Sequence, residues 1–413
     1  MILSPSSVDV VVVGAGPAGA AAATHLARSG RDVLVADKAT FPRDKCCGDG
    51  LTALALREME ALGFQPDSVP GWQPVDDCVL TSPSGRSISL ALPRNRGTYA
   101  VTAPRLELDA ALVDIARAAG AKVADGHAIG GVASEDDHLR VDVTGIGEVR
   151  TRYLIAADGA WSPVRKMVGV PHPPGYRGEW HAFRQYVSSV TGSAAEVMHI
   201  WFEADLVPGY FWSFPLPGGR ANIGYGVHRG GRVDIGDMGP LWLDLVERPH
   251  IRRALGPVAQ LEGRHSAWPI PARIDKVTLD ALDGRVLFIG DAAAAVDPMT
   301  GEGIGQALVT ARLAAGAVTE AGALEPHRAA ETYLRSVHDE LFADHRMSMV
   351  LIRALEHRKG ARAAVRVAGL TGWTRRNFAR WLFEDEPRAV LATPRRWHRG
   401  FLARDGAWAT MGP

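Results

Sequence analysis

The feature that most restricts the fold is a glycine-rich turn between an apolar strand and an alanine-rich helix near the start of the chain. The run 10–13 consists only of valine, the turn Gly-Ala-Gly-Pro-Ala-Gly occupies 14–19, and an alanine-rich stretch runs to Ser29. Gly30 ends that helix, and 32–36 is a second apolar run. Continuous apolar strands joined by a helical crossover predict a βαβ unit with a buried parallel sheet.

The spacing of the turn is that of a dinucleotide-binding loop. Gly14 permits the tight turn, Gly16 lets the backbone approach a pyrophosphate, and Gly19 allows the helix to pack closely on the strand. The helix that begins at Pro17 and Ala18 presents free N–H groups and a positive dipole to the phosphates. Asp37, at the end of the second strand, is placed to accept hydrogen bonds from ribose hydroxyls, and Lys38 follows it. We therefore expect these residues to hold a dinucleotide cofactor.

A second strand-to-turn segment favours FAD over NAD. The strand 285–289 ends in Gly290 and Asp291, and this acid can bind a ribityl hydroxyl, which NAD lacks. Beyond it, 298–305 reads Pro-Met-Thr-Gly-Glu-Gly-Ile-Gly and opens a helix. Its backbone N–H groups and helix dipole would stabilise reduced, anionic flavin. The cofactor residues expected from this segment are Gly290, Asp291, Pro298, Gly301, Gly303 and Ile304.

The remaining segments predict an α/β chain in which an FAD-binding domain is interrupted by a second unit. Residues 75–92 alternate around the turn Ser-Pro-Ser-Gly at 82–85, and 175–275 is rich in strand patterns and aromatic residues. We expect a Rossmann-like FAD-binding domain, an inserted, mostly antiparallel β-sheet substrate domain, and a helical C-terminal region. The expected boundaries are 1–74, 101–174 and 276–325 for the first, 75–100 and 175–275 for the second, and 326–413 for the third.

Composition excludes several other classes. The 46 basic and 46 acidic residues balance, which argues against a nucleic-acid partner recognised through a basic field. The three cysteines, Cys46, Cys47 and Cys78, have no spacing for a disulfide framework or a metal site. No signal peptide and no long apolar span is visible, so we expect a cytoplasmic protein without a metal.

At this point the residues resemble the geranylgeranyl reductase family, FAD-dependent oxidoreductases with a para-hydroxybenzoate-hydroxylase-like fold. Besides the glycine turn and 290–304, the resemblance rests on Phe-Pro-Arg-Asp-Lys-Cys-Cys-Gly-Asp-Gly-Leu at 41–51 and on Ala-Asp-Gly-Ala-Trp-Ser-Pro-Val-Arg at 157–165. A further segment, Gly-Tyr-Phe-Trp-Ser-Phe-Pro at 209–215, is similar to the substrate-cavity segment of prenyl reductases. The pattern is most similar to actinobacterial reductases that saturate one isoprene unit of menaquinone. The chain departs from the family's pattern in one respect: the family's proline often precedes the tyrosine by three residues, whereas here Pro208 precedes Tyr210 by two.

The resemblance implies a fold, a reaction and further site residues. The flavin would lie between the two domains and face an apolar cavity for an isoprenoid or lipid-quinone chain. Further cofactor contacts are implied for Arg43, Cys47, Gly48, Arg105, Asp158 and Gly159, and a cavity lining for Trp201, Tyr210, Trp212 and Phe214. Each of these aromatics can equally be core on an alternating strand.

Prenyl reduction needs a hydride from reduced flavin and a proton, for which Cys47 and Tyr210 are the candidates. Arg43 and Lys45 flank Cys47 in sequence, which favours a depressed thiol pKa; the alternative is a small residue packed beside the flavin. No second glycine fingerprint follows a strand, so electrons would come from NAD(P)H or a small redox protein.

Three other functions are compatible with parts of this pattern. Flavin halogenases need a downstream lysine, and this chain has none between Lys45 and Lys122. A flavin-dependent monooxygenase acting on a terpenoid or polyketide stays open as the alternative, although 298–303 has the reductase-like form. A binding protein that merely holds FAD would have little use for an apolar cavity beside the flavin.

The C-terminal region carries an excess of positive charge. Residues 351–413 contain thirteen Lys or Arg against five Asp or Glu. Tryptophans interleaved with arginines are typical of an interfacial helix on anionic lipid, which favours peripheral membrane contact, and the alternative is a helical cap packed on the FAD-binding domain. The residues concerned are Trp373, Trp381, Trp397 and Trp408 with Arg375, Arg376, Arg380, Arg395, Arg396 and Arg399.

Overall fold

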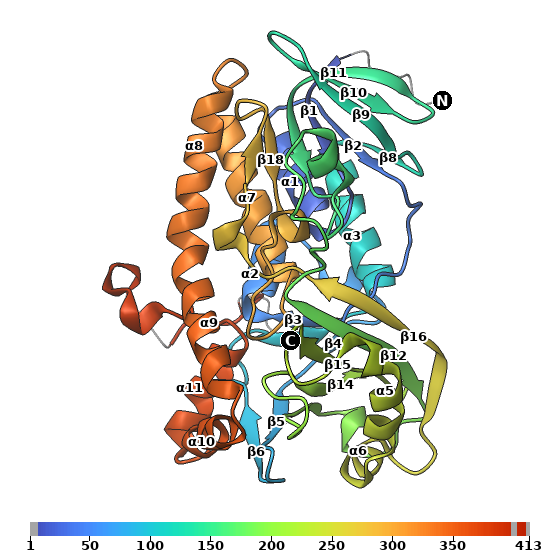
Figure 1. The fold of residues 1–413 in the computed structure, drawn as a ribbon, viewed down its shortest axis with the longest axis vertical. Coiled ribbons are helices and arrows are strands. Elements are labelled where there is room, and N and C mark those ends of the chain that lie inside the picture. The colour runs from blue at the N-terminus through green and yellow to red at the C-terminus, as the bar shows by residue number, and fades with distance from the viewer. Residues whose placement is uncertain (1–6, 398–402, 410–413) are drawn as a thin grey trace.

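The computed structural model describes residues 7–397 and 403–409 and shows two sheet-based units with a column of C-terminal helices along one side (Figure 1). The first unit is an eight-stranded sheet whose central strands are buried valine-, leucine- and isoleucine-rich runs. Its strand order is β17 (Asp280–Ala281), β18 (Val286–Phe288), β11 (Gly147–Ala156), β1 (Ser7–Val13), β2 (Val33–Asp37) and β8 (Lys122–Asp125). From β18 to β8 every pair is parallel, as expected for strands joined by crossovers.

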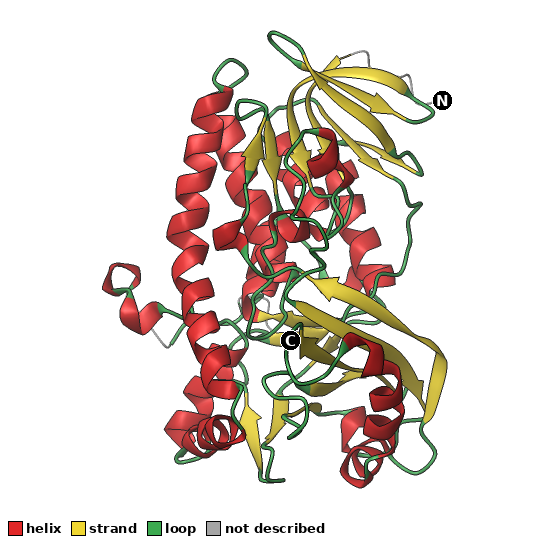
Figure 2. Cartoon of the chain, viewed as in Figure 1, coloured by secondary structure: helices red, strands yellow, loops and turns green. Residues whose placement is uncertain are grey.

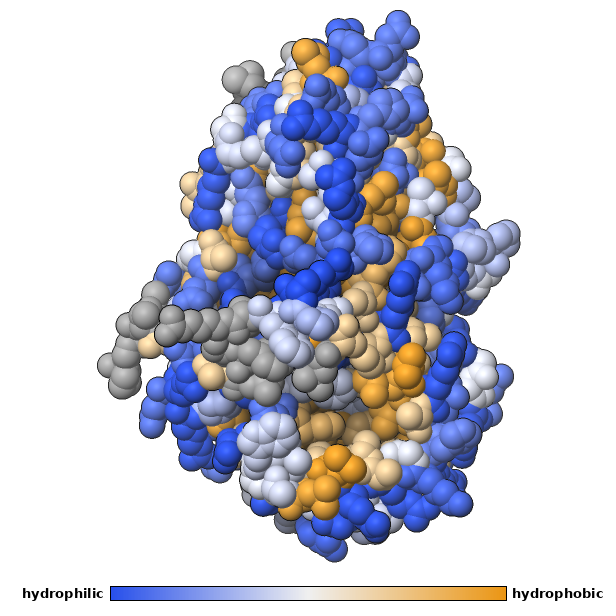
Figure 3. Space-filling model, turned by 90° about the vertical axis from the view of Figure 1, so that its left-hand side faces the viewer, coloured by the Kyte–Doolittle hydropathy of each residue, from blue (hydrophilic) through white to orange (hydrophobic). Residues whose placement is uncertain are grey.

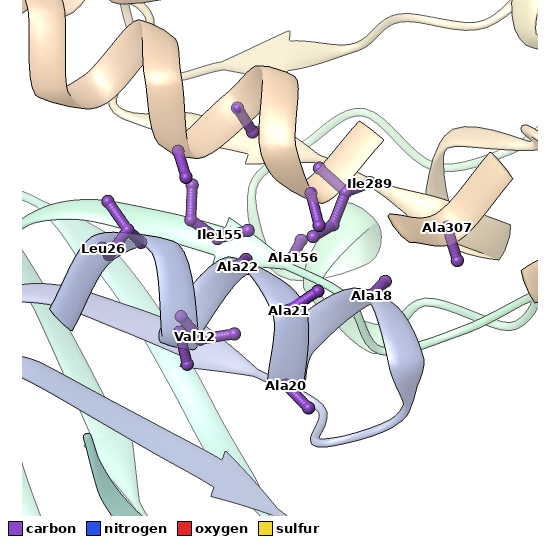
Figure 4. Close-up of a cluster of buried hydrophobic side chains, with 14 of the residues drawn as sticks. Val12, Ala18, Ala20, Ala21, Ala22, Leu26, Ile155, Ala156, Ile289 and Ala307 are labelled. Atoms are coloured by element: carbon purple, nitrogen blue, oxygen red, sulfur yellow. The ribbon is translucent and has the colours of Figure 1, made fainter. Parts of the chain in front are cut away.

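Helices cover this sheet and bury its apolar residues. Helix α1 (Pro17–Arg28) packs against α3 (Arg105–Ala118) and α7 (Ile304–Ala321). Figure 4 shows why the contact is close: α1 presents alanines where it meets α7 and the ends of the central strands. The long strand β11 also pairs antiparallel with β10 (Leu139–Val143), which pairs with β9 (Ile129–Ser134). The predicted Rossmann-like unit is confirmed.

The second unit is a seven-stranded sheet built from two distant parts of the chain (Figure 2). Its order is β16 (Gln260–Ile270), β12 (Trp180–Ser188), β15 (Arg220–His228), β14 (Phe211–Leu216), β13 (Met198–Trp201), β5 (Asp77–Thr81) and β6 (Ser87–Ala91). Only β13 and β5 run parallel, so the sheet is mostly antiparallel, as predicted. The hairpin predicted around 82–85 is β5–β6, whereas the exact domain boundaries stay a prediction.

A small third sheet and several helices complete the part of the chain before the C-terminal region. Strands β3 (Gly50–Thr52), β4 (Gln73–Pro74) and β7 (Ala100–Thr102) form a small sheet beneath the cavity described below. Helix α2 (Ala53–Ala61) follows directly, because Leu51 and Thr52 still pair with β7 as part of β3. The other helices are α4 (Pro163–Met167), α5 (Met238–Glu247) and α6 (Pro249–Leu255).

The C-terminal region is helical, as predicted, and its helices are α8 (Pro326–Val337), α9 (Ala343–Leu355), α10 (Arg358–Ala368) and α11 (Gly372–Leu382). None of the described helices is both long and apolar enough to cross a bilayer. Part of the aromatic and cationic pattern faces inward, which corrects the prediction that all of it suits a lipid surface. Trp408 is buried against Trp72, Arg380 pairs with buried Asp385, and Arg396 lies 2.9 Å from Asp344. Arg399 lies outside the described residues.

Candidate active site

A cavity of about 370 Å³ lies where the two sheets meet the C-terminal helices. One part of the lining is formed by glycine-rich turns of the FAD-binding domain, and the charged lining residues are Lys45, Arg105, Arg184, Asp291 and Glu302. Another part is apolar and is formed by the inner faces of α9, α10 and α11 through Leu351, Ala354, Leu355, Ala364, Val365, Phe378 and Leu382. A lining with both polar and apolar parts is expected for a cofactor beside a hydrophobic substrate.

The glycine turn has the geometry that its spacing predicts. Gly14 has φ +97°, and a Cβ there would lie 2.4 Å from the carbonyl oxygen of Ala157. A Cβ on Gly19 would lie 1.7 Å from the carbonyl oxygen of Gly14, so only glycine allows α1 to approach. Gly16, Pro17 and Ala18 line the cavity, and no side chain caps the N-terminus of α1. Its first N–H groups are therefore available to phosphate oxygens.

The two predicted acids differ in their surroundings. Asp37 lies beyond the cavity lining and accepts hydrogen bonds from the backbone nitrogens of Ala15 (2.7 Å) and Ala39 (2.8 Å). It thereby fixes the turn, and each oxygen keeps a second lone pair for a ribose hydroxyl. Asp291 does line the cavity, with Lys45 Nζ 3.4 Å from its Oδ2. Lys38, next to Asp37, is exposed.

Arg43 and Arg105 share one buried carboxylate that the sequence did not reveal. Arg105 binds Asp109 through two bonds of 2.6 and 2.7 Å, and Arg43 Nη1 lies 2.9 Å from the same side chain. Arg105 lines the cavity, and Nη2 of Arg43 would be 3.4 Å from a Cβ on Gly16. Two guanidinium groups beside the dinucleotide turn suit a pyrophosphate.

Among the residues expected at the remaining turns, some line the cavity and others shape its wall. Gly48, Gly159, Pro298, Gly301, Gly303 and Ile304 line it. Gly290 has φ +58° and packs against Ala18 behind the wall. Asp158 lies outside the cavity lining, and its carboxylate accepts hydrogen bonds from Ser162 Oγ (2.8 Å) and Val164 N (2.9 Å) at the start of α4, so its contact with the cofactor stays a prediction. Together, the turns, the acids and the arginines fit FAD.

Cys47 lines the cavity, but its chemistry differs from the prediction. Burial raises the pKa of the Cys47 thiol, and the positive charge of Arg105 opposes this only in part. The flanking Lys45 points instead toward Asp291. Cys47 is therefore a neutral thiol at neutral pH rather than a thiolate, which leaves it a proton to give.

Alternation along the strands decides which aromatics reach the cavity. Tyr210, Trp212 and Phe214 are spaced by two, and all three line it. Trp201 pairs with Phe211 across β13 and β14 and packs on the opposite face of the sheet, under α5 and α6. Because side chains alternate between the two faces of a strand, the prediction of Trp201 as a cavity residue was wrong.

Tyr210 is held at the flavin end of the cavity. Its hydroxyl donates to the carbonyl oxygen of Thr300, in the turn that precedes α7. Burial raises the pKa of this phenol well above its usual range. Tyr210 is thus a neutral hydroxyl group.

The sequence did not single out several charged residues at the site. Glu302, on the turn before α7, lines the cavity, and burial raises its pKa to about 7. Burial also raises the pKa of Glu384 to about 8, and Arg388 binds both Glu384 and Asp297. Glu302 lies inside a quoted motif and could have been noticed, whereas Glu384 and Arg388 come from the C-terminal region and gave no pattern.

Comparison with known proteins agrees with this arrangement. Residues 7–317 match the family model of an FAD binding domain. The chain is 34% identical to menaquinone reductase of Mycolicibacterium smegmatis, over 83% of this chain and 84% of that protein. It is 30% identical to digeranylgeranylglycerophospholipid reductase 2 of Methanopyrus kandleri, over 80% and 81%. A geranylgeranyl bacteriochlorophyll reductase-like structure from Thermoplasma acidophilum superposes with a TM-score of 0.75 at 20% identity, covering 94% of this chain and 99% of the other, which shows a common fold.

Proposed function

This chain belongs to the FAD binding domain family, in its geranylgeranyl reductase branch, and we propose that it is an FAD-dependent oxidoreductase that saturates a C=C bond of a prenyl chain. The cavity carries the proposal: the glycine-rich turns and five charged residues contribute to its lining, and most of the remaining lining is apolar, with Trp212, Phe214 and the residues of α9–α11. Such a lining accepts a hydrocarbon chain and offers few hydrogen-bond partners to a polar aromatic substrate. The relatives that act on menaquinone or on geranylgeranyl lipids by name support the same class of substrate.

In this proposal the residues of the chain bind, orient and exclude water. Gly16, Arg43 and Arg105 would hold the pyrophosphate of FAD, and Asp37 and Asp291 would bind its ribose and ribityl hydroxyls. Bound in reduced form, FAD supplies a hydride to one alkene carbon. Tyr210, Trp212 and Phe214 hold the chain against it, and the neutral thiol of Cys47 or the hydroxyl of Tyr210 donates the proton to the neighbouring carbon.

The test is an anaerobic incubation of dithionite-reduced holoprotein with menaquinone and, separately, with a geranylgeranyl lipid. Mass spectrometry of the lipids should show a gain of two mass units per reduced bond. A gain of sixteen that requires oxygen would support the monooxygenase alternative instead. Stopped-flow mixing of the oxidised holoprotein with NADPH or NADH distinguishes a nicotinamide donor, which bleaches the flavin directly, from a small redox protein.

We also propose that the outer surface of α9–α11 rests on an anionic membrane. Residues 343–382 carry nine Lys or Arg against two acids, and eight of the nine cations are exposed. Figure 3 looks onto the side with these helices and shows apolar side chains gathered in its lower half between hydrophilic borders. Exposed apolar residues on or beside these helices are Val350, Val367, Leu370 and Trp373. Protruding apolar side chains among exposed cations are typical of interfacial binding.

Sedimentation with vesicles tests the membrane contact. The protein should pellet with anionic vesicles at low salt and less with zwitterionic ones, and the double change Leu370→Ser with Trp373→Ser should weaken binding at least tenfold. Leu243, 65% exposed on α5, gives the matched control Leu243→Ser. The proposal would be contradicted if vesicle binding did not change with salt concentration or with the double substitution at Leu370 and Trp373, but was lost in Leu243→Ser.

A further inference from the structure

Asp49 is a buried carboxylate directly behind the cavity wall. It follows Cys47 and Gly48 on the lining loop, and its side chain has no exposed surface. Its Oδ2 accepts hydrogen bonds of 2.8 Å from Asn222 Nδ2 and from the hydroxyl of Tyr186, whereas its Oδ1 has no hydrogen-bond partner among the described residues. The backbone φ at Asp49 is +62°, a conformation uncommon for residues other than glycine. A strained residue with an unsatisfied buried oxygen indicates function more than stability.

The surroundings of Asp49 tune it for proton exchange. Burial raises its pKa to about 6, although hydrogen bonds from Asn222 and Tyr186 and the charges of Arg184 and Arg105 act in the opposite direction. An acid with this pKa holds and releases a proton near neutrality. The titratable and charged groups that face it are Arg184 and Tyr186 from β12, Arg220 from β15, Arg105 from α3, and Cys46 and Cys47 from its own loop.

Asp49 also connects the outside of the sheet with the cavity. On the inner side, Asn222 Nδ2 donates hydrogen bonds of 2.8 Å to both the Cys47 carbonyl oxygen and Asp49 Oδ2, and the negative charge of Asp49 is one of the causes, after burial, that raise the pKa of the Cys47 thiol. On the outer side, Tyr186 is half-buried, with the guanidinium groups of Arg184 and Arg220 4.3 and 5.1 Å from its ring centre. The series Tyr186, Asp49, Cys47 therefore runs from the edge of solvent to the cavity lining.

We propose that Asp49 and Tyr186 form a proton relay that recharges Cys47, an inference that rests on the prenyl reduction proposed above. One alkene carbon takes the hydride and the neighbouring carbon takes the proton of the Cys47 S–H bond. Asp49 returns a proton to the sulfur, and Tyr186 passes one from solvent to Asp49. In each cycle the alkene gains two hydrogens, the flavin loses two electrons, and one proton is drawn from solvent.

The first test is the pH dependence of multiple-turnover prenyl reduction by the holoprotein under anaerobic conditions with excess dithionite, because the relay acts between one turnover and the next. Because Asp49 acts in its protonated form, the wild-type rate should fall above about pH 6. Asp49→Asn should lower the rate at pH 6 by roughly 100-fold and abolish the fall in rate above pH 6. Asp44→Asn is the matched control, since Asp44 lies on the same loop, is exposed, and is 2.9 Å from Arg184; it should keep the wild-type profile. Wild-type rate and profile in Asp49→Asn would overturn the relay.

A second measurement does not depend on prenyl substrates. The rate of alkylation of Cys47 by iodoacetamide, located by mass spectrometry in the holoprotein, should show an inflection near pH 6 that Asp49→Asn abolishes and Asp44→Asn keeps. Tyr186→Phe keeps the ring between the two arginines, so it provides a folded variant if Asp49→Asn is unstable. It should slow multiple-turnover reduction while leaving the inflection. An inflection with no reduced lipid in the wild type would overturn the proposed function and not the relay. Reduced lipid without the inflection would overturn the relay alone.

Discussion

Arg388 joins the C-terminal region to the turn that lines the flavin end of the cavity. Its side chain is 2% exposed, and it lies 3.0 Å from Asp297, 3.1 Å from Glu384 and 3.2 Å from the hydroxyl of Thr300. Asp297 in turn accepts hydrogen bonds from the backbone of Met299 (3.0 Å) and Thr300 (2.9 Å), which fixes the turn. Replacing Arg388 with methionine keeps much of the volume and removes the charge.

The expected cost of Arg388→Met is about 3–5 kcal/mol of unfolding free energy at pH 7, because a buried carboxylate loses its partner. Arg395→Met is the control: the Arg395 side chain is 68% exposed and lies 3.6 Å from Asp339, so its loss should cost less than about 1 kcal/mol. Urea denaturation followed by tryptophan fluorescence measures both. Since the turn would loosen, the affinity for FAD, from flavin fluorescence quenching, should also fall in Arg388→Met and not in Arg395→Met.

The pH dependence of this loss gives a sharper test. In the wild type burial acts to raise the pKa of Asp297, but the charge of Arg388 and the hydrogen bonds from Thr300 and Ser348 together hold this pKa below its usual value. The ion pair therefore contributes stability above about pH 4, the unfolded pKa of an aspartate, and that contribution is lost as the pH falls through the lower folded pKa. Without Arg388, burial would raise the pKa of Asp297. The difference in unfolding free energy between wild type and Arg388→Met should therefore be largest above pH 7 and should become smaller toward pH 4. A difference in unfolding free energy below 1 kcal/mol, or one that is equal at pH 4.5 and 8, would refute this reasoning.

Three further outcomes are expected. Gly19→Ala should give protein without bound FAD and without its 450 nm absorbance, since its Cβ meets the Gly14 carbonyl oxygen, whereas Gly316→Ala in the open interior of α7 should keep FAD and gain about 0.5–1 kcal/mol. Burial raises the pKa of Glu384 to about 8, so its ionisation destabilises the fold. Glu384→Gln should therefore be more stable than the wild type by an amount that grows as the pH rises from about 4.5 to 8, on the order of 1 kcal/mol per pKa unit. Denaturation curves at several pH values measure this difference in stability, and a constant difference would contradict the prediction. Phe214→Ala should raise the KM for a prenyl substrate with little change in FAD affinity, and unchanged steady-state kinetics would remove Phe214 from the substrate path.

The sequence predicted most of the fold because its strongest patterns are local. The valine run at 10–13, the glycine turn at 14–19 and the acid at 37 lie within thirty residues and obey one βαβ geometry. The hairpin 77–91 was equally local, but its parallel pairing with β13, more than one hundred residues away, has no sequence pattern. Trp201 shows the consequence, since the face on which it lies depends on that pairing.

Buried charge was the hardest part of the site to foresee. Lys45 and Arg43 are the nearest cations to Cys47 in sequence, but Lys45 turns to Asp291 and Arg43 to Asp109. The residue whose charge acts most on the Cys47 thiol is Arg105, from α3, and burial outweighs it. Sequence distance predicts a pKa poorly because the desolvation of a group depends on everything that covers it.

The C-terminal region shows how one stretch of chain can serve two opposite environments. Its cations divide by helix face: Arg362, Arg366 and Arg375 point to solvent, whereas Arg380 and Arg388 turn inward to buried carboxylates. A count of charges along the sequence adds these two groups together and so overstates the positive charge that would face a membrane. The inward arginines bind the carboxylates of Asp297, Glu384 and Asp385, beside the cavity-lining residues 381–383. If the outer surface of α9–α11 rests on a membrane, as proposed above, an isoprenoid would reach the cavity from this face. Changes that reverse the outward charges should therefore alter capture of lipid substrate without altering FAD affinity, whereas changes to the inward ones should alter both.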